Sequence, residues 1–85
     1  MTQIQKLIAK ILSGTNDKNI RFSELCNVLI KMEFQQRIKG DHHIFYKEGI
    51  EEIINIQPKK KMAKPYQVKQ IRKLILDYKL GETDE

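Results

Sequence analysis

Two adjacent histidines, His42 and His43, are the residues of this chain best suited to proton transfer. The ordinary pKa of histidine, about 6.5, allows one ring to accept a proton and to donate it again near neutrality. Cutting RNA without a metal ion requires a base for the 2′-hydroxyl, an acid for the leaving oxygen and cations for the charged phosphorane. Residues 42–47 have the composition of a strand, on which neighbours point to opposite faces. The two rings are therefore not expected to act on one phosphate.

Alternation along this predicted strand distinguishes the two histidines. His43 shares a face with Phe45, the most apolar residue of the strand, whereas His42 shares a face with Ile44 and Tyr46. If Phe45 packs beneath helices, His42 points to the open face. We predict that His42 is the catalytic general acid and base, the alternative being a structural or merely exposed histidine. For His43 we expect a core or hairpin role.

Cations near the histidines are candidates for holding phosphates. Arg37 and Lys39 precede the turn at Gly40-Asp41 and share one face of the preceding strand, where they can flank a scissile bond. The lysines after residue 58 suit phosphate positioning better than base reading. Ordinary solvated surface charge is the alternative for all of them. The predicted RNA-binding residues are Arg37, Lys39, Lys59, Lys60, Lys61 and Lys64.

No metal site or cofactor is expected. Adjacent strand histidines without paired carboxylates nearby have poor ligand geometry, and the chain has no glycine-rich phosphate loop. The lone Cys26 lies among apolar residues, which favours a buried thiol over a nucleophile.

Helices must surround the predicted sheet. Apolar residues recur at helical spacing in three segments, residues 4–12, 25–32 and 68–78. Ser23 is a candidate cap for the second helix, and Pro65 suits the first turn of the third. Each segment is therefore predicted to be an amphipathic helix that packs its apolar side into the core.

Three short segments with strand character lie between the second and third helices. Residues 34–39, 42–47 and 51–56 are separated by two tight turns, which predicts an antiparallel meander. The expected fold class is α+β, in the order α-α-β-β-β-α, with a three-stranded antiparallel sheet packed on helices. Helices on one face of so small a sheet leave the opposite face open to a ligand.

Length and composition bound the organisation of the chain. Its 85 residues suit a single domain. We divide residues 1–85 into an extra N-terminal helix and loop at 1–21, a core at 22–80 and an acidic tail at 81–85. No apolar stretch approaches the roughly 18 residues that span a bilayer, and the N-terminus lacks the pattern of a secretory signal. The expected location is cytoplasmic, with no membrane partner.

The charge is concentrated toward the C-terminal part of the chain. The 16 basic and 11 acidic residues give a net charge of +5. Between residues 57 and 80, Asp77 is the one acidic residue among many basic ones, and Lys69, Arg72 and Lys73 lie on the predicted solvent side of the third helix. A field of this sign attracts phosphate polyanions or an acidic partner protein.

The stretch at residues 22–80 resembles the HicA family of toxin–antitoxin toxins. The sequence GDHH at 40–43, followed by Ile44-Phe45, is similar to the family's Gly-Ser-His hairpin and its aromatic strand. The sequence IINIQP at 53–58 is similar to the family's third strand with its closing proline, and a basic loop and a helix follow. One departure is Asp41, which stands where the family usually has serine.

The resemblance implies a fold like the double-stranded-RNA-binding domain and endoribonuclease activity on mRNA, with the family's catalytic histidine falling on His42. It also implies a partner, an antitoxin of the HicB family, that covers the RNA face. Two alternatives are a non-catalytic RNA-binding module that grips A-form backbone, and a protein-interaction or DNA-binding domain.

Overall fold

The computed structural model describes residues 2–80. The predicted α+β class and the order α-α-β-β-β-α are confirmed, with one added turn of 3-10 helix, η1. The acidic tail predicted at 81–85 lies outside the described residues. The elements are α1 (Gln3–Ser13), η1 (Asp17–Asn19), α2 (Phe22–Lys31), β1 (Gln35–Lys39), β2 (His42–Lys47), β3 (Ile50–Ile56) and α3 (Pro65–Tyr78).

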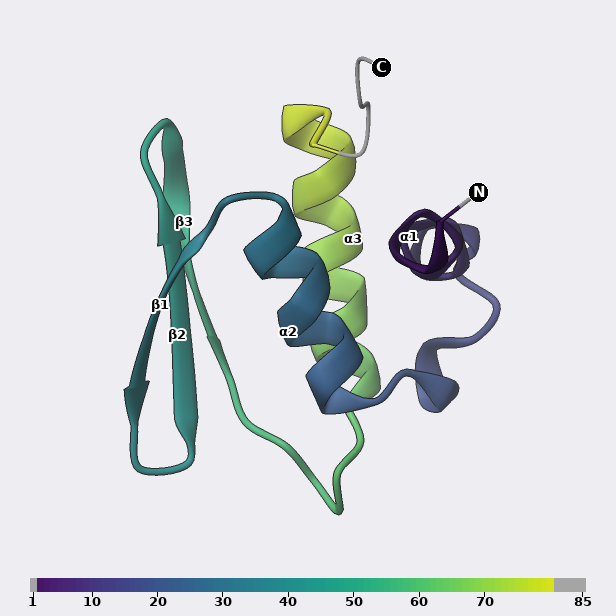
Figure 1. Cartoon of the computed structure of the whole chain (residues 1–85), viewed down its shortest axis with the longest axis horizontal. Coiled ribbons are helices and arrows are strands. Elements are labelled where there is room, and N and C mark those ends of the chain that lie inside the picture. Colours follow the sequence, from purple (N-terminus) through teal and green to yellow (C-terminus); the bar gives the residue numbers. More distant parts are fainter. Residues whose placement is uncertain (1, 81–85) are drawn as a thin grey trace.

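The elements form three layers (Figure 1). An antiparallel sheet in the order β1-β2-β3 makes the first layer, with β2 in the centre. Helices α2 and α3 lie on one face of the sheet, and α1, which contacts both, lies on their far side, where Figure 1 shows it end-on. None of the described helices covers the other face of the sheet, which is the open face predicted from the sequence.

The core lies between the sheet and the layer of α2 and α3. Phe45 at the middle of β2 and Ile54 of β3 have no exposed surface. They belong to one core cluster with Leu25 of α2 and Ile71 of α3, which are equally buried. Complete burial of side chains of this size stabilises a fold by about 1.5–3 kcal/mol each. The inward side of β2 is therefore fixed by Phe45.

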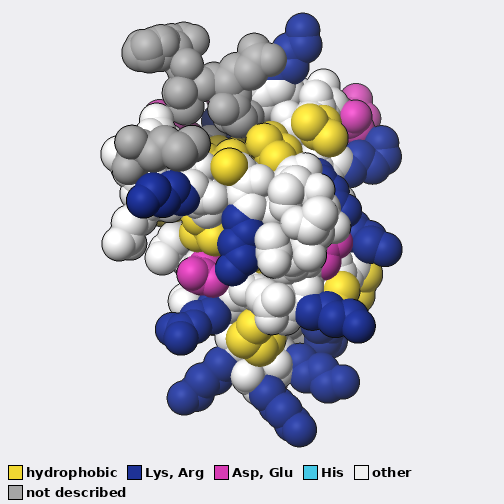
Figure 2. Space-filling view, turned by 90° about the vertical axis from the view of Figure 1, so that its right-hand side faces the viewer, with side chains coloured by type: hydrophobic (Ala, Val, Ile, Leu, Met, Phe, Trp, Pro, Cys, Tyr) yellow, Lys and Arg dark blue, Asp and Glu magenta, His cyan; other side chains and the backbone are white. Residues whose placement is uncertain are grey.

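Basic side chains gather at one end of the molecule. Figure 2 views the protein from the α1 side, and its dark-blue Lys and Arg side chains concentrate at the lower end. Figure 1 places the loop between β3 and α3 at that end, together with the first turns of α2 and α3 and the hairpin between β1 and β2. The β1–β2 hairpin, which carries the histidines, therefore lies at the same end as residues 57–64, which we call the lysine loop.

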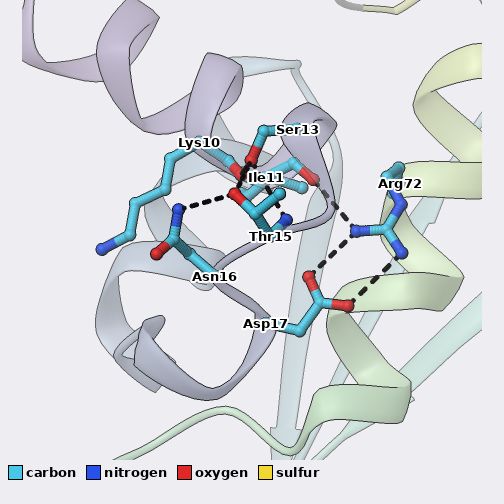
Figure 3. Close-up of polar contacts among 7 residues, drawn as sticks. All are labelled: Lys10, Ile11, Ser13, Thr15, Asn16, Asp17 and Arg72. Atoms are coloured by element: carbon cyan, nitrogen blue, oxygen red, sulfur yellow. Dashed lines mark hydrogen bonds and ion pairs between the residues drawn. The ribbon is translucent and has the colours of Figure 1, made fainter.

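The N-terminal helix is fastened to the core by Arg72 of α3 (Figure 3). Its guanidinium donates to both carboxylate oxygens of Asp17, at 2.9 and 3.3 Å, and to the carbonyl of Ile11 near the end of α1, at 3.1 Å. Ile8 and Ile11 of α1 are themselves buried. The prediction that Arg72 belongs to a solvent-facing basic surface is wrong, because its side chain is only 19% exposed.

The structure corrects the predicted start of the second helix and confirms the predicted start of the third. Ser23 does not cap α2, because the helix begins one residue earlier at Phe22, and the backbone N–H of Arg21 donates to the Glu24 carboxylate at 2.9 Å. Pro65 does occupy the start of α3.

Tyr78, the last residue of the apolar spacing at 68–78, was predicted to face the core, but it is exposed. Its hydroxyl donates a hydrogen bond to the Glu52 carboxylate at 2.7 Å, and this bond raises the pKa of the Tyr78 hydroxyl.

Candidate functional site

His42 is the first residue of β2 and lies exposed on the open face of the sheet. The face follows from the strand register, since Phe45 points into the core and His42 is an odd number of residues away. The Nδ1 atom of His42 lies 3.0 Å from the Oδ1 atom of Asn55, which projects from β3. The site therefore holds an imidazole whose ring is oriented by a neighbouring strand.

His43 points to the opposite face, as alternation predicts. Its ring meets the Phe22 ring of α2 edge-on, with centroids 4.9 Å apart and planes at 76°. Its Nδ1 lies 3.2 Å from the Oε1 atom of Gln36 on β1. His43 is half-buried in this position and ties the hairpin to the start of α2.

Arg37 and Lys39 of β1 share the open face with His42. In the register of the β1–β2 pair, Lys39 stands directly opposite His42 and Arg37 directly opposite Ile44. The Cβ atoms of residues paired in this way lie about 4.5–5.5 Å apart, and both cationic side chains are exposed. Arg37 and Lys39 therefore project from the same face of the sheet as His42.

The loop after β3 presents Lys60 and Lys61 at the tip of a tight turn. The backbone groups of Lys59 and Met62 exchange two hydrogen bonds of 3.0 Å, so the two lysines between them form the whole turn. Their φ angles are 52° and 69°, the left-handed region that a two-residue type I′ turn requires and that Asn-Gly usually fills. Non-glycine residues held in this region store strain, and such strain clusters at functional positions.

Gln67 holds both ends of this loop. Its side chain is fully buried, its Oε1 accepts from the Lys64 backbone N–H at 3.1 Å, and its Nε2 donates to the Gln57 carbonyl at 3.1 Å. Buried polar groups are costly unless they are paired, and here one amide satisfies a backbone group on each side of the loop. The positions of the lysines are thus tied to the core.

Phe22 connects the histidine hairpin with the lysine turn. Its backbone N–H donates to the Lys61 carbonyl at 3.0 Å, and its ring contacts His43. The predicted cations nevertheless fall into two groups. Arg37 and Lys39 flank His42 on the open face, whereas the four lysines of residues 59–64 belong to the loop at the lower end in Figure 1.

Sequence reasoning missed further residues of this region. Lys18 of η1 lines a groove together with Lys59 and Lys64, and Arg21 lines a neighbouring groove with Lys60 and Lys61. Both come from the N-terminal part of the chain, and no sequence pattern indicates that they meet the distant loop.

Asn55 was missed too, although a signal for it exists. It is the exposed polar residue between the buried Ile54 and Ile56, so the same alternation that chooses His42 puts Asn55 on the open face.

Cys26 has the properties of a structural thiol. It packs against the core from α2, and burial raises its pKa to about 11. A thiol with a raised pKa stays protonated near neutrality and is a poor nucleophile. Cys26 is therefore not a candidate nucleophile.

Within residues 2–80, no three His, Cys, Asp or Glu side chains come together in a group that could hold a metal ion. The helices of that same part of the chain are too short or too polar for any of them to cross a membrane.

Comparison with protein families places this chain in the class of toxins from toxin–antitoxin systems. Residues 22–75, well over half of the chain, match the family described as the HicA toxin of bacterial toxin-antitoxin. The chain belongs to the HicA toxin family, and this membership implies an antitoxin partner. The matched segment contains the sheet, both histidines and the lysine loop, and it leaves out α1 and η1. No curated protein and no solved structure matches the chain significantly.

Proposed function

We propose that this toxin is an endoribonuclease, an mRNA interferase, in which His42 transfers protons at a phosphodiester bond. The observation that carries the proposal is the exposed His42 ring on the open face, with Asn55 at its Nδ1 and Lys39 opposite it on β1. An oriented imidazole with cations beside it satisfies the basic needs of RNA cleavage without a metal ion.

In the proposed reaction, His42 removes the proton of a ribose 2′-hydroxyl. The 2′-oxygen then forms a bond to phosphorus while the bond from phosphorus to the 5′-oxygen breaks. The proton held by His42 is available to the departing 5′-oxygen, so the products are a 2′,3′-cyclic phosphate and a 5′-hydroxyl. Arg37 and Lys39 stabilise the charge that develops on the phosphorane oxygens.

The lysine loop supplies the remaining affinity for the RNA backbone. Lys59, Lys60, Lys61 and Lys64 belong to the basic end of the molecule, where the first turns of α2 and α3 also point. Backbone N–H groups at helix starts and lysine ammonium groups both favour phosphate oxygens. Contacts of this kind hold RNA in register without reading its sequence.

The test compares His42→Ala with His43→Ala, a matched change at the next residue. Each protein is incubated with end-labelled RNA in EDTA, and the products are analysed for length and for cyclic phosphate ends. We expect His42→Ala to abolish cleavage and growth arrest with an unchanged fold. His43→Ala should keep cleaving and should lose about 0.5–1.5 kcal/mol of stability with its aromatic contact.

The results also separate the alternatives. Cleavage by His42→Ala at the wild-type rate refutes the proposed role of His42. Wild-type protein that retards RNA on a gel without shortening it is a non-catalytic RNA-binding module. Retention on duplex DNA, with no effect on RNA, indicates a DNA-binding domain instead.

We further propose that the antitoxin is HicB-like and covers the open face, hiding His42 and offering acidic groups to Arg37 and Lys39. The charge sign of the face supports this choice. If rim charges contribute, the toxin–antitoxin complex weakens as salt concentration rises. An affinity that does not respond to salt contradicts the electrostatic part of this proposal.

A further inference from the structure

The side chains of His42 and Asn55 form a hydrogen bond on the open face of the sheet. The atom of Asn55 that approaches His42 Nδ1, at 3.0 Å, is the carboxamide oxygen Oδ1. A carboxamide oxygen accepts hydrogen bonds and cannot donate them, so the proton of this contact belongs to Nδ1. The neutral His42 ring then carries its lone pair on Nε2, the nitrogen that remains for a substrate.

We propose that Asn55 is the positioning residue of His42: it holds the neutral ring in the tautomer with the proton on Nδ1 and fixes the ring orientation. The catalytic meaning of this role rests on the proposed nuclease function. A second group that fixes tautomer and orientation is a recurring requirement of histidine acting as a base.

The place of Asn55 in the sheet supports this role. It stands opposite Ile44 in the β2–β3 register, and its backbone neighbours Ile54 and Ile56 are buried, so the strand position of its side chain is set by the core. A partner on a rigid strand orients a ring better than one on a loop. The contact is exposed, and replacing Asn55 removes it without opening a cavity.

The chain contains a matched contact for comparison. His43 Nδ1 meets an amide oxygen in the same way, at 3.2 Å from Gln36 Oε1, but on the helix side of the sheet and against the Phe22 ring. Gln36→Ala therefore removes an amide oxygen from a histidine that the proposed reaction does not use. This variant is the control for Asn55→Ala.

The first experiment measures tautomers in the full-length protein without RNA. Two-bond ¹H–¹⁵N correlation spectra of ¹⁵N-histidine protein distinguish a protonated Nδ1 from a protonated Nε2. We expect His42 of the wild type to show the Nδ1–H form and Asn55→Ala to shift it toward Nε2–H. Gln36→Ala should leave the His42 signals unchanged. A wild-type His42 with the proton on Nε2, or no response to Asn55→Ala, overturns the proposal.

The second experiment measures cleavage against pH. Loss of a partner that orients a functional side chain lowers activity by about 10–100-fold, and we expect Asn55→Ala to lower kcat in this range with little change in KM. Asn55→Asp keeps an acceptor and adds a negative charge that favours the imidazolium. It should recover much of kcat while the rising limb of the pH profile moves about 1 unit higher.

The two experiments separate this inference from the nuclease proposal. If the tautomer responds as expected but the wild type does not cut RNA, the contact is established and its catalytic meaning is overturned. If the wild type cuts RNA and Asn55→Ala cuts it equally fast with the same pH profile, the nuclease proposal survives and the positioning role fails.

Discussion

The double variant Lys60→Asn/Lys61→Gly should stabilise the protein and weaken its binding to RNA. Both lysines have positive φ angles, 52° and 69°, in a turn that Asn-Gly fills without strain. Left-handed backbone costs an ordinary residue about 1–2 kcal/mol relative to one that accepts it. We expect the free energy of unfolding to rise by about 1–3 kcal/mol, and Tm by about 4–8 °C for each kcal/mol in a chain of this size.

The same change removes two positive charges from the lysine loop. Each phosphate neutralised contributes roughly 0.7–0.9 to the slope of log affinity against log salt concentration. If both lysines contact RNA, the slope should fall by up to about 2, and the affinity at low salt should fall with it. Stability and affinity thus move in opposite directions, which separates a binding defect from unfolding.

Thermal melting followed by circular dichroism gives the stability, and fluorescence anisotropy with labelled RNA at several KCl concentrations gives the slope. Lys60→Arg/Lys61→Arg is the control, because it keeps the charge and the strain and should change neither quantity. A lower Tm for the Asn-Gly variant refutes the strained-turn argument. An unchanged salt slope shows that the turn does not contact phosphates.

Three other experiments test separate parts of the structure. Gln67→Met keeps the side-chain volume but leaves two backbone groups of the lysine loop unpaired, and we expect urea denaturation to show a loss of about 2–4 kcal/mol. Arg72→Ala removes the cation that pairs with the shielded Asp17 and binds α1, and it should cost about 2–4 kcal/mol, with Asp17→Asn costing less. Cys26, whose pKa is raised to about 11, should react slowly with a thiol reagent at pH 8 and rapidly after unfolding.

The parts of the fold that short-range pattern determines were predictable. Period-two alternation identified which histidine is exposed, because Phe45 is buried on one side of β2. Helical spacing found three helices, and tight turns found the meander. The start of α2 was predicted two residues too late, because Ser23 was expected to cap the helix and Arg21 occupies the N-cap position.

The parts that depend on contacts between distant segments were not predictable. Arg72 reads as surface charge on an amphipathic helix, and only its meeting with Asp17, 55 residues away, makes it an anchor for α1. Gln67 stands just before the apolar spacing of α3 and has the pattern of an ordinary surface residue. Its burial is explained by its hydrogen bonds to both ends of the lysine loop. Neither the Arg72–Asp17 ion pair nor the hydrogen bonds of Gln67 can be inferred from a sequence pattern.

The buried Phe45 also determines which histidine lies on the open face, where His42 is proposed to act. In a two-sided strand, a slip of one residue against its neighbours exchanges every inward side chain for an outward one. Such a slip would expel the phenyl ring into water, turn His42 toward the helices and present His43 in its place. Burial of Phe45, three residues after His42, therefore disfavours a misfolded form of the strand. In that form both imidazoles would be intact, but His43 would face the solvent in place of His42.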